Sequence, residues 1–176
     1  VYKRQGHLRM IGVSLYRRML QRSLANARGE TPKDEWRAQV GIGIEGTIPA
    51  EHLPEPELRI ELASALDRVD DEPGLDRLHS DTLDRFGPMP ASLETLFALA
   101  ALRLRCQTLG IRRLDAGPKA VAATFVQADA AALQKRIRPA TDGPLRWSDC
   151  KLVLEVASQT DAERWEAVEA LLDRLT

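Results

Sequence analysis

The segment from residue 90 to residue 109 carries apolar side chains on nearly every side of the helix that it would form. They include Leu93, Leu96, Phe97, Leu99, Ala100, Leu102 and Leu104. A surface helix keeps a polar face, whereas a helix that is apolar all round has to be covered by other elements. Gly87-Pro88 before the segment and Gly110 after it are typical helix-terminating residues. The sequence therefore predicts a central helix around which the rest of the domain packs.

Two amphipathic helices are predicted ahead of this central helix. Their apolar stripes are Leu58, Leu62, Leu66 and Val69 in the first, and Leu75, Leu78, Leu83 and Phe86 in the second. Residues 70–74 (Asp-Asp-Glu-Pro-Gly) are expected to separate the two helices, since they contain a proline and a glycine. Residues 49–56 hold three prolines and are expected to form an extended connection.

Several short segments show the alternation or turn residues of β-strands. Val40, Ile42 and Ile44 alternate with Gly41, Gly43 and Glu45. Residues 111–116 and 120–126 flank Gly117-Pro118-Lys119 and are expected to form a hairpin. Residues 145–147 and 150–156 are expected to form another strand pair. A helix is predicted near 128–137, and a last helix should open at the capping box Thr160-Asp161-Ala162-Glu163.

These elements predict an α+β fold, in which a small antiparallel sheet packs against several helices. Leu8, Ile11, Leu15, Met19 and Leu20 predict an N-terminal helix over about 8–28. A polar linker over 29–35 follows it. We therefore expect a joining segment over 1–35, made of a helix and a linker, and a separate domain over 36–176. The chain begins with Val1 rather than Met, which suggests a fragment of a longer protein.

Composition describes a globular chain with a substantial core. Of its 176 residues, 44% are hydrophobic and 29% are charged. The net charge of −1 gives no overall attraction to nucleic acid or to a membrane. No apolar run is long enough to span a bilayer, and the N-terminus does not resemble a signal peptide. Cys106 and Cys150 lie among apolar residues, which favours buried thiols in the cytoplasm, with a disulfide between them as the alternative.

The charges are distributed unevenly along the chain. Residues 1–29 hold seven basic residues and no acidic ones, whereas residues 55–85 hold ten acidic residues and four arginines. Such asymmetry is typical of surfaces that face different partners. Ordinary solvated helix faces remain the default interpretation of such a distribution, and surfaces for different partners are the alternative.

Motifs for catalysis or cofactor binding are missing. No glycine-rich loop precedes a Lys-Ser or Lys-Thr pair, as a phosphate-binding loop would require. The glycines at 41, 43 and 46 have dinucleotide-like spacing, but they fall within a predicted strand that no helix follows directly. His7, His52 and His79 are too scattered for a zinc site. Asp70-Asp71-Glu72 lacks the spacing of a calcium loop. We therefore expect no catalytic residue, no cofactor and no metal in this chain.

Four motifs in order resemble the C-terminal domain of bacterial transcription-repair coupling factors. They are Asp84-Arg85-Phe86-Gly87-Pro88-Met89-Pro90, Leu102-Arg103-Leu104-Arg105, Leu109-Gly110-Ile111 and Ala116-Gly117-Pro118-Lys119. Upstream, residues 5–7 and 11–16 resemble the segment that joins the family's motor to this domain. Asp142-Gly143-Pro144 and the helix of Trp165 also fit, so the resemblance extends over nearly the whole chain from Gln5.

The resemblance implies a regulatory domain of a larger machine. The family's parent protein is an ATP-driven double-stranded DNA translocase that displaces stalled RNA polymerase and recruits UvrA for nucleotide excision repair. ATP and Mg²⁺ would belong to its motor and not to this chain. The domain would dock on the UvrA-binding module of the same protein, mask that surface and restrain the motor. The docking residues carried over from the family are Asp81, Asp84 and Arg85, where the family usually has Glu in place of Asp81.

Helical spacing is compatible with this assignment. Asp81, Asp84 and Arg85 are three and four positions apart and would share one helix face, while Leu83 and Phe86 could turn toward the core. The alternative is an ordinary surface pair between Asp81 and Arg85.

A nucleic-acid-binding module is a different class of function. It would use the basic helix in 1–29, or four arginines in and just after the second half of the central helix. Those arginines are Arg103, Arg105, Arg112 and Arg113. A stand-alone enzyme is a third class, but no nucleophile or acid–base pair suggests one.

Overall fold

The computed structural model describes residues 36–126, 145–148 and 150–175. The chain divides into two compact units, Val1–Trp36 and Arg37–Thr176, and the account below concerns the second unit. The helices predicted at 8–28 and 128–137 lie outside the described residues.

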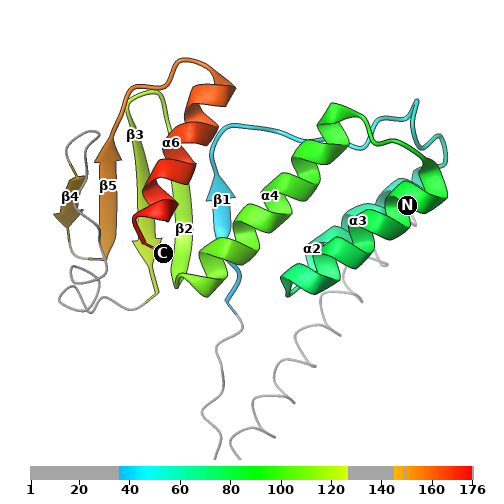
Figure 1. Ribbon diagram of the computed structural model, residues 1–176, viewed down its shortest axis with the longest axis horizontal. Helices are drawn as coiled ribbons and strands as arrows, with labels where there is room; N and C mark the ends of the chain where they lie inside the picture. The colour runs from blue at the N-terminus through cyan, green and yellow to red at the C-terminus, as the bar shows by residue number, and fades with distance from the viewer. Residues whose placement is uncertain (1–35, 127–144, 149, 176) are drawn as a thin grey trace, which may run out of the picture. The chain divides into compact units, whose positions relative to one another are not determined.

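Three helices form the first layer of this unit. They are α2 (Pro56–Arg68), α3 (Glu72–Phe86) and α4 (Ala91–Thr108). Figure 1 shows α2 and α3 side by side, with α4 between this pair and the sheet. The buried core among the three helices consists of Leu53, Leu62, Leu66, Leu75, Leu93, Phe97, Ala100 and Leu104. The predicted central helix is confirmed, because α4 also buries Leu102 and Cys106.

A five-stranded sheet forms the second layer. Its strands are β1 (Gln39–Gly41), β2 (Ile111–Ala116), β3 (Ala120–Phe125), β4 (Leu145–Ser148) and β5 (Lys151–Glu155), in the order β1-β2-β3-β5-β4. All neighbouring strands are antiparallel except β1, which pairs with β2 in parallel. Helix α6 (Asp161–Asp173) packs along the sheet in Figure 1. The predicted α+β class is confirmed, with one parallel pair added.

Two predicted boundaries were wrong. Helix α3 begins at Glu72 rather than near Leu75, because Asp71 is its N-cap and accepts a hydrogen bond from the Gly74 backbone N–H at 2.7 Å. Pro73 therefore lies in the first turn, where a missing N–H costs nothing. Strand β1 ends at Gly41 and does not continue to Ile44, since the chain bends at residues 42 and 43 and Gly43 has a φ of 68°.

The two cysteines are free thiols. Burial raises the pKa of Cys106 to about 12, so this thiol stays protonated at neutral pH. Because both thiols are free in the structure, the disulfide alternative is wrong. Among the described residues, none of the helices is long and apolar enough to cross a membrane.

The capping box of α6 is present as predicted. The Thr160 hydroxyl accepts from the Glu163 backbone N–H at 3.2 Å, and the Glu163 carboxylate accepts from the N–H groups of Gln159 and Thr160 at 2.6 and 3.1 Å. These backbone hydrogen bonds lower the pKa of Glu163 below its ordinary value of 4.5. Since the folded state favours the ionised carboxylate, its contribution to stability is full above pH 4.5 and is lost as the pH falls through the lowered pKa.

We predict that Glu163→Gln lowers the melting temperature at pH 7 and that its deficit relative to the wild type shrinks as the pH falls below 4.5. Thermal melting of the 176-residue chain over a series of pH values measures this deficit. Glu166→Gln, on the exposed side of the same helix, is the matched control and should show little change. A deficit for Glu163→Gln that does not depend on pH would contradict the charge-based account.

Candidate docking surface

Helix α3, which carries the three predicted docking residues, is fixed at both ends and along its inner side. Asp71 caps its start, and Gly87, with a φ of 80°, ends it. Leu75 and Thr82 are its buried residues. The Thr82 hydroxyl donates to the Leu78 carbonyl at 2.6 Å, so this buried polar group is satisfied within the helix. The helix therefore presents its outer residues from a rigid support.

Asp81, Asp84 and Arg85 are all exposed on α3. Asp84 lies opposite the buried side of the helix, because it follows Thr82 by about half a helical turn. None of the three forms an ion pair within the part of the chain that the structure describes. The Arg85 guanidinium instead lies over the Phe86 ring, with Cζ 4.8 Å from the ring centroid. The alternative of a simple Asp81–Arg85 surface pair is thus not formed in this structure.

Leu83 does not occupy the core position that its apolar side chain suggested. It is 43% exposed, whereas Thr82 is 2% exposed. Phe86 is half-buried and packs against the helical core, as expected. A polar residue takes the inward position because its hydroxyl finds the Leu78 carbonyl one turn earlier. Apolar periodicity alone predicts that Leu83 is buried, because it takes no account of this local hydrogen bond of Thr82.

Asp81 and Arg85 also line a shallow groove between α2 and α3, with a volume of about 70 Å³. The other lining residues are Leu58, Glu61, Leu62, Ala65, Leu78, Thr82 and Phe86. Asp84 is not among them. Glu61 is a third charged residue at this groove, and sequence reasoning missed it. The residues around Glu61 in the sequence contain no signal that it lies close to α3. The groove forms only when the two helices pack against each other.

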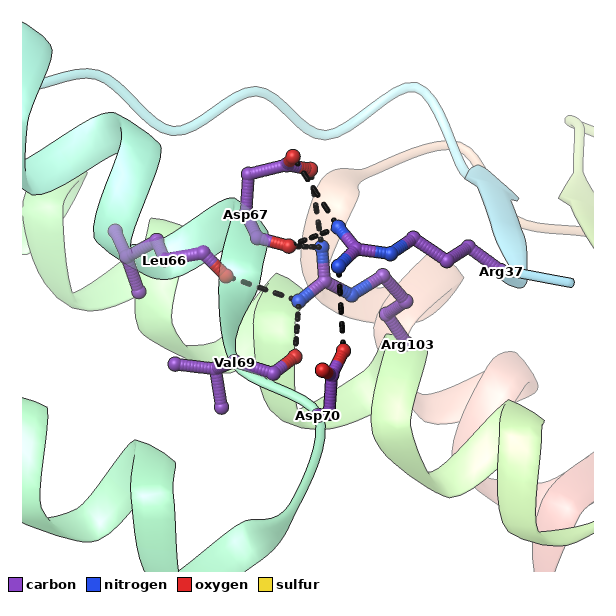
Figure 2. Close-up of polar contacts among 6 residues, drawn as sticks. All are labelled: Arg37, Leu66, Asp67, Val69, Asp70 and Arg103. Carbon is purple, nitrogen blue, oxygen red and sulfur yellow. Dashed lines mark hydrogen bonds and ion pairs between the residues drawn. The ribbon is translucent and has the colours of Figure 1, made fainter. Parts of the chain in front are cut away.

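A pair of arginines secures the end of α2 (Figure 2). Arg103, from α4, donates through Nη2 to the carbonyls of Leu66 at 2.9 Å and Val69 at 3.1 Å. These carbonyls belong to the last turn of the helix and to its C-cap residue, where the helix supplies no backbone donor for them. Arg103 thus caps α2 with a side chain that is 15% exposed.

Arg37 completes this arrangement from the segment that leads into β1. Its guanidinium donates to the Asp67 carbonyl and lies 3.2 Å from each of the Asp67 and Asp70 carboxylates. Burial, and then the neighbouring charge of Arg37, lower the pKa of Arg103. Figure 2 shows Asp67 in contact with both arginines and Asp70 in contact with Arg37, so two carboxylates offset the repulsion between the two neighbouring guanidinium groups.

The other arginines considered for nucleic-acid binding are mostly engaged within the domain. Arg105 pairs with Glu169 at 2.5 Å and with Asp173 at 2.6 Å, which ties α4 to α6. Arg113 pairs with Asp115 on the same strand at 2.8 Å. Of the four, only Arg112 has no ion pair among the residues that the structure describes. These four positions do not form a free basic surface.

The residues considered for metal or nucleotide binding have other contacts. Asp70 binds Arg37, and Asp71 caps α3. His79 lies 3.2 Å from Glu94 and packs its ring edge against Phe97. Across the described ranges, no three His, Cys, Asp or Glu residues are placed to hold a metal ion. Gly46 opens no helix and instead packs against α4.

Comparisons with known proteins point to one family. The TRCF domain model matches residues 42–136. The transcription-repair-coupling factor of Escherichia coli (strain K12) is 27% identical over 130 residues, which is 71% of this chain and 11% of that protein. The protein of the same name from Rickettsia typhi is 26% identical over 117 residues, covering 65% of this chain and 10% of its own length. The chain thus spans about a tenth of the length of these curated relatives.

A solved structure shares the fold. The crystal structure of a C-terminal domain of transcription-repair coupling factor matches with a TM-score of 0.67 at 16% identity, covering 82% of this chain and 95% of that one. At this identity the match establishes the fold alone. Because the family model covers more than half of the sequence, this chain belongs to the TRCF domain family of transcription-repair coupling factors.

Proposed function

We propose that this chain is the regulatory C-terminal domain of a transcription-repair coupling factor and that it docks on the UvrA-binding module of the same protein. In this proposal the parent is an ATP-driven translocase on double-stranded DNA that displaces stalled RNA polymerase and recruits UvrA. Docking masks the UvrA-binding surface and restrains the motor. The observation that carries the proposal is the outer side of α3, where Asp81, Asp84 and Arg85 are exposed and have no ion pair among the described residues.

Charged residues of this kind are suited to a reversible contact. An exposed charge without a partner contributes little to the stability of the free domain. Across an interface, the same charge steers association and selects the partner. A docking site in the same chain also benefits from a high effective concentration, so a modest intrinsic affinity is sufficient to keep the surfaces together. The capped α3 presents these charges without first having to become ordered, which lowers the cost of binding.

The nucleic-acid-binding alternative has weaker support. Arg103 and Arg105 contact α2 and α6 within the domain, and Arg113 pairs with Asp115. The basic segment 1–29 lies outside the described residues and supplies no geometry in favour of that function.

The test of the proposed function reverses two adjacent charges on α3. We predict that Asp84→Arg combined with Arg85→Glu leaves the domain folded, increases UvrA binding and raises the ATPase rate of the full-length coupling factor. Opposite charges across the interface become like charges, and a loss of about 2 kcal/mol would shift the docking equilibrium roughly thirtyfold. UvrA binding and ATPase activity in full-length protein are measured beside thermal melting of the 176-residue chain.

Asp76→Arg combined with Arg77→Glu is the matched control. It makes the same exchange at an exposed Asp-Arg pair on the same helix, two turns earlier. It should change UvrA binding much less than the Asp84 and Arg85 exchange. Unchanged UvrA binding and ATPase activity in the folded Asp84 and Arg85 variant would refute the docking role.

A further inference from the structure

We propose that the groove between α2 and α3 receives one lysine or arginine side chain of the docking partner, and that Glu61 determines this specificity. The inference rests on the proposed function, because it takes the UvrA-binding module as the partner. Beyond that function, it specifies that the partner's contact residue is basic and that Glu61 on α2 belongs to the docking site.

The groove has an apolar floor and a charged rim. Its apolar lining comes from both helices: Leu58, Leu62 and Ala65 of α2, and Leu78 and Phe86 of α3. The charged residues that line it are Glu61 from α2 and Asp81 and Arg85 from α3. A volume of about 70 Å³ suits part of a single long side chain and is too small for a helix or a strand.

The charge of the rim favours a cation. Glu61 and Asp81 form no ion pair with any other described residue, so both carboxylates are available to a partner. Arg85 does not neutralise them by pairing, because its guanidinium lies over the Phe86 ring at 4.8 Å. The rim therefore carries one excess negative charge, counting two carboxylates and one guanidinium.

Lysine and arginine fit both features of the groove. Their aliphatic stems can cover apolar surface while the charged end reaches a polar rim. A purely apolar side chain would remove water from Glu61 and Asp81 without replacing it, which is unfavourable for a carboxylate. An acidic side chain would be repelled by both carboxylates. A basic residue of the partner is thus the occupant that the groove selects.

The groove and Asp84 are separate contact points on one surface. Asp84 is exposed on α3 but does not line the groove, whereas Asp81 and Arg85 do. A partner that covers the outer side of α3 could therefore contact Asp84 and insert a side chain beside Asp81. This arrangement requires α2 as well as α3, so a substitution on α2 tests it independently.

The experiment compares Glu61→Lys, Glu61→Asp and Glu57→Lys in full-length coupling factor. Glu57 is an exposed glutamate one turn earlier on α2 that does not line the groove, so it controls for the change in net charge. We expect Glu61→Lys to raise apparent UvrA affinity about tenfold, the factor produced by 1.4 kcal/mol, while Glu61→Asp and Glu57→Lys stay near the wild type. Thermal melting of each 176-residue variant verifies folding, and Glu61→Gln serves if the lysine variant melts early.

Two failures can be told apart. In the first, the Asp84 and Arg85 exchange increases UvrA binding, but Glu61→Lys has no more effect than Glu57→Lys. The groove then does not receive a basic side chain, and the proposed function stands. If neither variant changes UvrA binding, the docking model itself is wrong and the groove proposal is refuted with it.

Discussion

Arg103→Ala is expected to lower the free energy of unfolding by about 3 kcal/mol, mainly because the C-terminal end of α2 loses its hydrogen-bond donor. The side chain donates to the carbonyls of Leu66 and Val69 at 2.9 and 3.1 Å. Alanine would leave both carbonyls without their charged donor. It would also remove a cation from beside Asp67, whose carboxylate lies 3.4 Å from Arg103. Urea denaturation of the 176-residue chain measures the change.

Arg103→Lys is the informative control for this substitution. Lysine keeps the positive charge but cannot reproduce the planar fork that reaches several acceptors at once. We expect it to recover less than half of the lost stability. If Arg103→Ala and the wild type unfold at the same urea concentration, Arg103 does not secure α2. The arginine would then be available for another role, such as a nucleic-acid contact.

Gly46→Ala is expected to destabilise the domain by about 2 kcal/mol through overpacking. A Cβ atom at this position would lie 2.6 Å from the backbone nitrogen of Leu96 and 2.9 Å from the carbonyl oxygen of Ser92. Those are backbone atoms of α4, which cannot move aside as a flexible side chain could. The neighbouring Thr47 N–H donates to the same Ser92 carbonyl at 3.1 Å, so the clash would also strain this hydrogen bond.

Gly117→Ala is the matched control for a glycine substitution. No atom lies within 4 Å of a Cβ at residue 117, and its φ is outside the left-handed region. We expect this variant to be as stable as the wild type or slightly more stable, because alanine restricts the unfolded chain. Thermal melting of both variants gives the comparison. Equal melting temperatures for Gly46→Ala and the wild type would show that the strand-to-helix connection can relax away from α4.

Features set by neighbouring residues were predictable from the sequence. The apolar residues all round α4 required a covered helix, and Leu93 and Cys106 are indeed fully buried. Gly87 and Gly110 end helices with positive φ angles, as their positions suggested. The Thr160 capping box formed because both of its hydrogen bonds lie within a single turn. Each of these signals acts over a few residues, so no knowledge of the tertiary structure was needed.

Features that depend on a local competition were predicted less well. The start of α3 was placed too late because Pro73 and Gly74 look like a break, although Asp71 caps a helix that includes both. Leu83 is exposed where burial was expected, and the neighbouring Thr82 is buried, because the threonine hydroxyl donates to a carbonyl of the preceding turn. Strand β1 pairs with β2 in parallel, and its short sequence contains nothing that specifies the direction of its partner.

The family, the α+β class and the positions of Asp81, Asp84 and Arg85 on one helix followed from the sequence alone, because motifs and periodicity are local properties. Tertiary packing decided which charges are available. It joined Arg37 and Arg103 to the end of α2 across separations of 30 residues or more, and it paired Arg105 with α6. It also brought Glu61 to the groove beside Asp81. Contacts between residues so far apart form only when helices pack, since the chain between them imposes no fixed distance or direction.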